Sequence, residues 1–225
     1  MDLLRRCFIV VLCVTTVNAH VQCPKGNNEM PGGEIGLPFP PDKCAVPTED
    51  FLKYVVNRVY VSAYVIDTLR LTSAISTQRR FTVQPDGSIV STFAYAAGDS
   101  CQSFDVIYPG IRDDIAVFPE PENRDFRVLS CSPAEYLITY HCRDVTEIVC
   151  GKCPRIAVLI YVRDRREDKD GDGIPDGDPD FTDVPWGEIE KFSKHCLGED
   201  FENDDLLGWK WKGRSQPENC TLLSA

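Results

Sequence analysis

The chain has 225 residues, which is enough for one large β domain or two small domains. Its 24 Lys and Arg against 35 Asp and Glu give a formal net charge of −11, and so acidic a chain repels phosphate backbones, which excludes nucleic acid as a main partner. Hydrophobic residues make up 43% of the chain, a globular composition. No apolar run reaches the ~18 residues that a membrane-spanning helix needs, so we do not expect the chain to span a membrane.

The first 19 residues have the pattern of a secretory signal peptide. Arg5 and Arg6 form a basic start, residues 7–14 are apolar, and small or β-branched side chains stand just before His20. A first core strand is the alternative interpretation of this segment. The signal pattern predicts that the chain is secreted and works in an extracellular, oxidising environment.

Cysteines are abundant, and two of the 11 lie in the expected signal peptide. Outside the cell the others are expected to form disulfides. They are Cys23, Cys44, Cys101, Cys131, Cys142, Cys150, Cys153, Cys196 and Cys220. Because their number is odd, one of them is unpaired or bonds to another chain, and the spacing alone leaves the pairing open.

The spacing of Cys150 and Cys153 also matches the C-x-x-C motif of disulfide redox enzymes. Those enzymes place the motif at the start of a helix beside a βαβ unit, whereas here it lies between two β-rich runs. We therefore favour structural bridging, with redox activity as the alternative. The sequence shows no other catalytic motif, so we predict no catalytic residues, no catalytic cofactor and a protein that is not an enzyme.

Residues 20–48 are rich in proline and glycine and predict an extended N-terminal arm. Eight β-rich runs follow, over residues 58–71, 81–84, 89–93, 103–108, 115–118, 126–131, 136–142 and 156–163. Pro85-Asp86-Gly87-Ser88, between the second and third runs, is typical of a hairpin turn.

The links between these runs are mostly too short for parallel crossovers, so we expect an antiparallel up-and-down sheet, sandwich or barrel. Helical periodicity appears only after the last run, with Trp186, Ile189, Phe192 and Cys196 on one face. Eight strands followed by one late helix suit a small barrel with a helix packed outside. The predicted fold is all-β, an eight-stranded antiparallel up-and-down barrel with one C-terminal α-helix.

Two of these β-rich segments resemble motifs of the lipocalin family. Residues 126–142 are similar to the second motif, although Cys131-Ser132-Pro133 stands where the family usually has Thr-Asp-Tyr. Residues 155–163 are similar to the third motif, a hydrophobic strand closed by an arginine, here Arg163. The resemblance implies that the β-rich runs close into a lipocalin-like barrel.

Two further features support the resemblance more weakly. Residues 57–60 match the first lipocalin motif, Gly-x-Trp-Tyr, only in Tyr60. Cys23 near the expected mature start and Cys220 near the end are placed as in lipocalins like apolipoprotein D.

The first motif also raises a question about the barrel floor. In lipocalins its tryptophan fills the floor and packs against the arginine of the third motif, but Val59 stands at that position here. Valine cannot make this cation–π contact with Arg163, which is worth about 0.5–2 kcal/mol. Either Arg163 finds another ring, with Trp186 as the candidate, or the floor is built differently.

An eight-stranded barrel has room for one small ligand when large aliphatic side chains do not fill it. Because side chains alternate between the two faces of a strand, we expect several aromatics to share the inner face. The expected ligand contacts are Tyr60, Tyr64, Phe93, Tyr95, Tyr136, Ile138 and Tyr140. Such a wall suits a flat apolar ligand with a polar end, and the resemblance implies a lipid, sterol, retinoid, bilin or carotenoid. Alternatively, these side chains belong to the packed core or the outer face.

An acidic loop after the last β run has the spacing of a calcium site. Aspartates alternate with other residues and are followed by Gly173, which supplies a tight turn. An EF-hand has glutamate where Pro179 stands, so the loop instead resembles those of thrombospondin type 3 repeats. The expected ligands of a structural Ca²⁺ are Asp168, Asp170, Asp172, the carbonyl of Ile174, Asp176 and Asp178. A solvated acidic linker is the alternative.

We therefore expect five segments. They are a signal peptide (1–19), a Pro/Gly-rich arm (20–48), a lipocalin-like barrel (49–166), an acidic calcium-loop insertion (167–182), and a helix with a disulfide-tethered tail (183–225). The predicted function is a secreted lipocalin-like carrier of a small hydrophobic ligand, with structural calcium. The alternatives are a calcium-dependent extracellular interaction or matrix protein that uses the barrel as a scaffold, and a redox or lipocalin-type isomerising enzyme.

Overall fold

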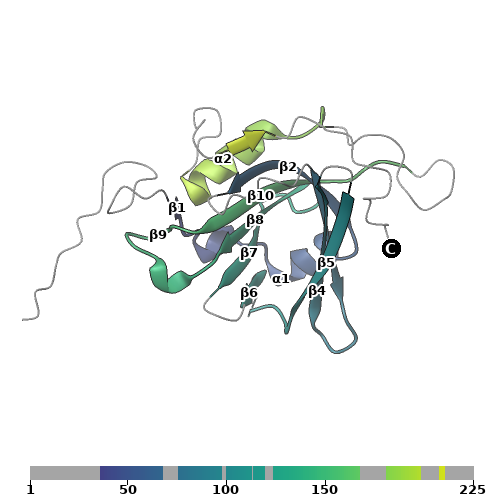
Figure 1. Ribbon diagram of the computed structural model, residues 1–225, viewed down its shortest axis with the longest axis horizontal. Coiled ribbons are helices and arrows are strands. Elements are labelled where there is room, and N and C mark those ends of the chain that lie inside the picture. The colour runs from purple at the N-terminus through teal and green to yellow at the C-terminus, as the bar shows by residue number, and fades with distance from the viewer. Residues whose placement is uncertain are drawn as a thin grey trace, which may run out of the picture.

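The computed structural model describes residues 36–67, 76–97, 100–112, 114–119, 124–167, 181–198 and 208–210. They form a nine-stranded antiparallel sheet that curls into a nearly closed barrel (Figure 1). The strands follow the order β5 (Ser100–Tyr108), β4 (Ile89–Ala97), β3 (Ser76–Val83), β2 (Val59–Asp67), β10 (Ile156–Arg163), β8 (Tyr136–Cys142), β7 (Asp125–Leu129) and β6 (Val117–Pro119), while β11 (Gly208–Lys210) also pairs with β2. Since the first long strand, β2, pairs with the last, β10, the predicted all-β fold with its barrel and C-terminal helix is confirmed.

The hairpin between β3 and β4 forms where its turn residues predict it. The Gln84 N–H donates to the Ser88 carbonyl at 2.8 Å, and Asp86 Oδ1 accepts from the Ser88 N–H at 2.9 Å. Gly87 has a φ of 84°, a left-handed conformation that a residue without Cβ adopts freely. The strand before the turn begins at Ser76 rather than at residue 81, so it includes two arginines that the predicted strand left out.

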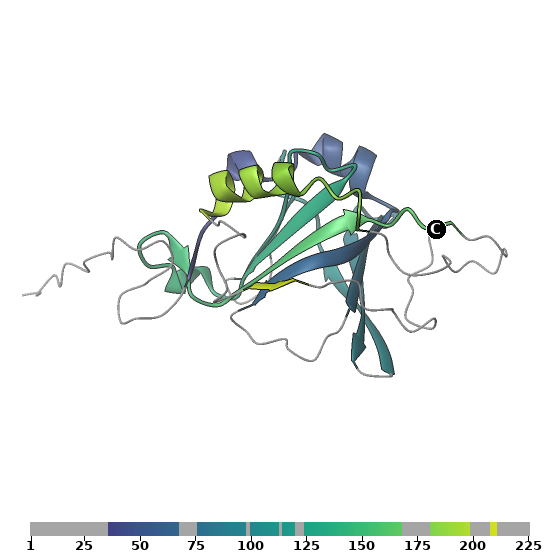
Figure 2. The same ribbon diagram turned by 90° about the horizontal axis from the view of Figure 1, so that it is seen from above.

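The helix α2 (Trp186–Leu197) lies across the outer side of the barrel (Figures 1 and 2). Its buried residues include Ile189, Cys196 and Leu197, and it ends at Gly198, whose φ of 66° gives a left-handed cap. A disulfide joins Cys196 to Cys44, which ends the 3-10 turn η1 (Asp42–Cys44). Among the helices that the structure describes, none is both long and apolar enough to cross a bilayer.

Backbone pairing holds the segment that leads into the barrel. The strand β1 (Leu37–Pro38) pairs with β9 (Lys152–Cys153), which follows the 3-10 turn η3 (Val145–Glu147). The Val46 N–H donates to the carbonyl of Val128 in β7 at 2.8 Å, and the Val46 carbonyl accepts from the Ala116 N–H at 2.7 Å. The segment then continues as α1 (Thr48–Asp50) and the π-helical turn η2 (Phe51–Val55).

Buried side chains form two large clusters on opposite sides of the sheet. The outer cluster lies beneath α2 and includes Tyr136, Ile138, Val158, Ile160 and Ile189. The inner cluster fills part of the barrel and includes Phe51, Phe81, Phe118, Phe126 and Tyr161. Strands β8 and β10 send alternate side chains into both clusters and are buried on both faces.

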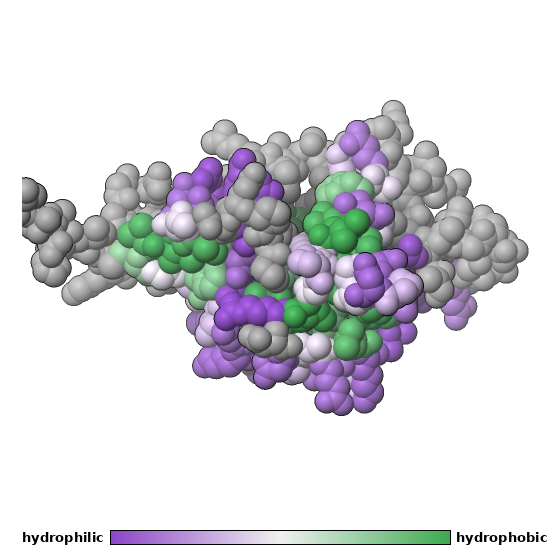
Figure 3. All heavy atoms as spheres, turned by 90° about the horizontal axis from the view of Figure 1, so that it is seen from below, coloured by the Kyte–Doolittle hydropathy of each residue, from purple (hydrophilic) through white to green (hydrophobic). Residues whose placement is uncertain are grey.

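Hydrophobic side chains also reach the surface of the molecule. When the molecule is seen from below, they are bordered by hydrophilic side chains (Figure 3).

Tyr60 is part of the barrel floor. Its side chain is fully buried, and its hydroxyl lies 3.0 Å from the Tyr54 carbonyl and 2.8 Å from the Pro133 carbonyl. Burial raises the pKa of Tyr60, so the hydroxyl keeps its proton and donates. This contact ties η2 to the turn between β7 and β8. Asn57, just before β2, has a φ of 64°, a conformation that asparagine tolerates better than most residues.

We predict that replacing Cys44 and Cys196 together by serine lowers the free energy of unfolding by about 2–5 kcal/mol. The bridge spans a sequence separation of 152 residues, so its loss frees a long loop in the unfolded chain and releases α2 from the arm. Denaturant unfolding followed by circular dichroism measures the change. Cys131→Ser is the control, because this thiol is free and exposed, and we expect a loss below about 1 kcal/mol. Equal losses in both variants would contradict the assignment.

We predict that Tyr60→Phe lowers the free energy of unfolding by about 1–3 kcal/mol, because it removes the O–H donor that the partly buried Tyr54 and Pro133 carbonyls share. Tyr161→Phe is a matched control, since Tyr161 is also fully buried but its hydroxyl donates to no backbone carbonyl. We expect that variant to be as stable as the parent. A Tyr161→Phe variant that loses more stability than Tyr60→Phe would refute this account of the floor.

Candidate functional site

The barrel interior is the candidate site, and a bulge in β2 decides which side chains reach it. The register between β2 and β10 slips at Ala63, because Ser62 and Tyr64 face consecutive residues of β10. One extra residue in a strand reverses the alternation of the side chains that follow it. Tyr60 and Val65 consequently belong to the inner cluster, whereas Tyr64 belongs to the outer cluster. The prediction that Tyr64 contacts ligand is wrong for this reason.

The expected ligand contacts on β8 also lie outside the barrel. Tyr136 packs against Phe192 of α2, with ring centroids 6.4 Å apart, and Tyr140 packs against Phe39 of the arm at 5.8 Å. Ile138 lies between them in the outer cluster. The prediction that these three residues line the cavity is wrong, because the helix and the arm cover this face of β8 and bury its apolar side chains outside the barrel.

Two expected contacts, Phe93 and Tyr95 of β4, do lie on the inner face of the sheet. Phe93 packs against the inner cluster, and its ring centroid lies 5.9 Å from that of Tyr95. Phe104 of β5, directly opposite Phe93, has its centroid 5.2 Å from the Phe93 ring and is 48% exposed. We call Phe93, Tyr95 and Phe104 the rim cluster. Their partial exposure shows that this part of the interior is open to solvent.

Toward the β3–β4 turn, the interior is packed with aromatic rings. The Phe51 ring centroid lies 5.2 Å from that of Phe81 and 5.5 Å from that of Phe118. Tyr108 lies 4.8 Å from Phe118 and 5.4 Å from Phe126 by the same measure. All five side chains are buried. These rings and Tyr60 close one end of the barrel, so a ligand has to approach from the rim cluster.

Arg79 of β3 lies between this packed half and the rim cluster. It is 9% exposed and stands opposite Phe93 in the sheet. Its guanidinium carbon is close to several ring centroids, those of Phe126 (4.7 Å), Phe93 (5.3 Å), Phe81 (5.7 Å) and Tyr161 (5.8 Å). Its Nε is sealed from solvent without a hydrogen-bond partner. Within the described part of the chain, no carboxylate pairs with this cation.

Two buried hydroxyls on the inner face also lack partners. They belong to Ser91 and Thr139, which are in step with inner-cluster residues of their own strands, while Thr77 and Tyr161 carry two further buried hydroxyls that neighbour each other. Buried polar groups are normally hydrogen-bonded, and those that are not indicate water or a ligand. The open part of the interior therefore combines aromatic rings, hydroxyls and one cation.

Arg79, Phe104, Thr139 and Tyr161 were not among the predicted site residues. The alternation of Thr77, Arg79 and Phe81 is a signal for a strand, but two adjacent arginines are more typical of a solvated segment. On β8 the more apolar face lies outside, under the helix and the arm, and on β10 both faces are apolar. A period of two therefore does not identify the inner face of either strand.

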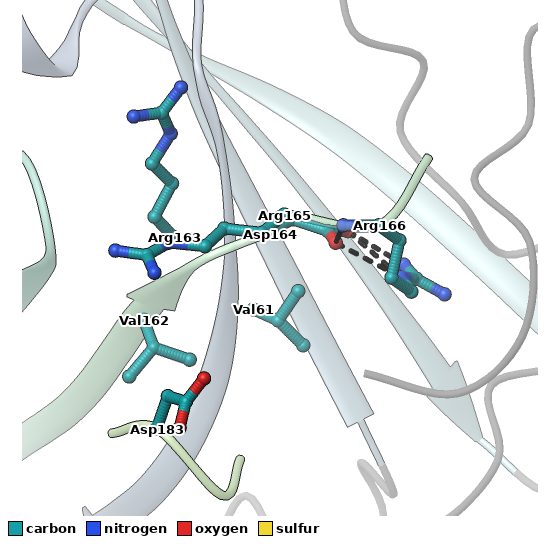
Figure 4. A pocket seen from close by; sticks show the side chains of 7 residues that line it. All are labelled: Val61, Val162, Arg163, Asp164, Arg165, Arg166 and Asp183. Carbon is teal, nitrogen blue, oxygen red and sulfur yellow. Dashed lines mark hydrogen bonds and ion pairs between the residues drawn. The ribbon is translucent and has the colours of Figure 1, made fainter. Parts of the chain in front are cut away.

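Arg163 does not pack on Trp186. It is exposed at the end of β10, where it lines an outer pocket of about 210 Å³ together with Val61 and Val162 (Figure 4). No cation–π pair of the described residues includes Arg163, and Trp186 packs against the outer cluster. The candidate role of Trp186 is wrong, and the floor is built differently, with Tyr60 at its centre.

The structure shows the bonding state of several of the predicted disulfide cysteines. Cys44 bonds to Cys196, Cys142 bonds to Cys153, and Cys150 is disulfide-bonded as well. The two cysteines of the C-x-x-C motif are therefore not bonded to each other, which fits structural bridging. Among the cysteines whose side chains the structure describes, Cys131 carries a free thiol. Cys23 and Cys220 lie outside the described residues, and so does the side chain of Cys101.

The expected calcium ligands, residues 168–178, also lie outside the described residues. Within the part that is described, no group of three or more His, Cys, Asp or Glu side chains is arranged to hold a metal ion. The calcium loop thus stays a prediction from the sequence.

No family model and no curated protein matches this chain. Among solved structures, the siderocalin Q83, described as having a dual ligand binding mode, is similar at 12% identity, with a TM-score of 0.51 over 79% of this chain and 98% of that one. The siderocalin Ex-FABP, described as functioning through dual ligand specificities, is 10% identical with a TM-score of 0.45 over 70% of this chain and 90% of that one. The barrel is accordingly lipocalin-like in fold.

Proposed function

We propose that this protein is a secreted carrier that binds one small, largely apolar ligand in the open half of its barrel. The observation that carries this proposal is the rim cluster, in which inward-facing aromatic rings remain partly exposed beside unpartnered hydroxyls. Ligand sites are typically concave and apolar with a few polar groups that fix orientation. The similarity in fold to a siderocalin with a dual ligand binding mode is compatible with this role.

Secretion is supported by the cysteines. Disulfides such as Cys44–Cys196 and Cys142–Cys153 persist in oxidising compartments and are rare in the cytosol. The N-terminal signal pattern points in the same direction. Cys153 is bonded to Cys142 and not to Cys150, so the C-x-x-C motif supports no redox activity in this proposal.

We also propose that the loop over residues 168–178 binds a structural Ca²⁺. Its support is the spacing of aspartates and glycine alone. Extracellular sites of this kind need only about 10⁻⁴–10⁻³ M affinity to be filled. The ion would order the connection between β10 and α2.

We predict that Phe104→Ala weakens the binding of an apolar fluorescent probe by about tenfold or more, because the variant removes an aromatic wall from the open half of the barrel. The control is Ile107→Ala on the same strand. Ile107 is 69% exposed and faces the other side of β5, so we expect unchanged binding.

Solvent extraction of the native protein followed by mass spectrometry tests the same proposal without a variant. A co-purifying apolar molecule supports the carrier. A barrel that yields no ligand and binds no probe would reject it and favour the scaffold for an extracellular or matrix partner.

We predict that calorimetry detects Ca²⁺ binding at millimolar concentration and that Asp170→Ala abolishes it, since the variant removes one carboxylate from the expected ligand set. Asp105→Ala is the control, because this exposed aspartate lies on β5, far from the loop in sequence. If calorimetry detects no heat of Ca²⁺ binding to the parent chain, the loop is a solvated linker.

A further inference from the structure

Two arginines of the barrel are almost equally buried but have opposite surroundings. Arg127, on the outer side of β7, is 3% exposed and Arg79, on the inner side of β3, is 9% exposed. A guanidinium carries five N–H donors and cannot lose its charge, so burying it without partners is unfavourable. Arginine is accordingly almost never buried unless it is paired. The surroundings of Arg127 show how this chain meets that requirement.

Arg127 has acceptors for most of its N–H donors. Its Nε donates to Asp125 at 2.7 Å, and its Nη1 donates to Asp42 at 2.7 Å and to the Pro40 carbonyl at 3.0 Å. The Phe39 ring covers the guanidinium, with a centroid 4.2 Å from Cζ. Carboxylates therefore supply the counter-charge and the ring fills the remaining face.

Arg79 has only the rings. They lie 4.7–5.8 Å from its Cζ, and no hydrogen bond or ion pair joins its guanidinium to another residue of the described chain. Aromatic faces attract a cation but do not accept the in-plane N–H groups of a guanidinium. The missing element, compared with Arg127, is a carboxylate.

The surroundings of Arg79 favour a ligand as the source of that carboxylate. Thr77 precedes it by two residues on the same face of β3 and has a buried hydroxyl, as has Tyr161, whose ring packs near the guanidinium. On the rim side, Phe93 stands directly opposite Arg79, and Phe104 stands opposite Phe93. An anionic head at Arg79 would thus find donors around it and aromatic rings along the rest of the molecule.

We infer that the barrel selects an apolar molecule that carries a carboxylate, bound with the carboxylate at Arg79 and the apolar part against the rim cluster. This inference rests on the proposed carrier function and adds the chemical class of the ligand to it. A charge-assisted pair between guanidinium and carboxylate is about twice as strong as a neutral hydrogen bond, and a partly dry site strengthens it further.

The test compares one apolar probe in two forms, cis-parinaric acid and its methyl ester, by fluorescence titration of the full chain. The unmodified protein should bind the acid at least about tenfold more tightly than the ester. Arg79→Gln should remove this preference, so that acid and ester bind with equal affinity. Arg79→Lys keeps the charge without the fork of donors and should retain part of the preference. Arg80→Gln removes the same charge from the neighbouring position on the opposite face and should leave the preference intact.

The outcomes separate the inference from the proposed function. If acid and ester bind equally well to the unmodified chain, the carrier stands and carboxylate recognition is overturned. If the preference survives in Arg79→Gln, another group recognises the anion and the role of Arg79 is overturned. If neither form binds, both proposals fail. Should Arg79→Gln unfold, the acid–ester comparison on the unmodified chain and on Arg79→Lys still decides.

Discussion

The barrel depends on the burial of β8 and β10 on both faces. Their outward side chains pack under α2 and the arm, while their inward side chains meet the contents of the barrel. A strand in this position buries about twice as much apolar surface as a strand with one solvent-exposed face. The backbone of β10 is also paired on both edges. The disulfide between Cys44 and Cys196 keeps the covering layer in place, so the shape of the interior depends indirectly on a bond outside it.

This double burial also explains which parts of the structure could be predicted. The turn at Pro85–Ser88 and the run of short antiparallel strands follow from local chemistry, and both are found. The inner face of β8 could not be predicted from polarity, because the more apolar face, with Tyr136 and Ile138, packs under α2, whereas the inner face carries the polar Thr139. The orientation of Tyr64 was also beyond the sequence, since the bulge that reverses it depends on the register with β10.

Arg79 illustrates a different limit. A pair of adjacent arginines is typical of a solvated segment, and only the extension of β3 back to Ser76 places one of them inside the barrel. The cysteine count predicted one cysteine that is unpaired or bonded to another chain, and only the positions of the side chains in space show that Cys131 carries a free thiol. The floor is a similar case, because the sequence showed that Val59 cannot act as a tryptophan but not that Tyr60 takes over through two backbone carbonyls.

The depth of Arg79 sets the orientation of any bound molecule. Rings such as Phe81 and Phe126 fill the barrel beyond it, so a ligand that reaches the guanidinium has its charged end innermost and its apolar end toward Phe104. The chain as a whole is strongly acidic and repels an anion at long range. Attraction therefore has to come from the short-range field of one cation in a partly dry site, where charges are screened least. A site of this kind selects ligands by the depth they can reach, because a carboxylate that stays in the solvent meets only the repulsion.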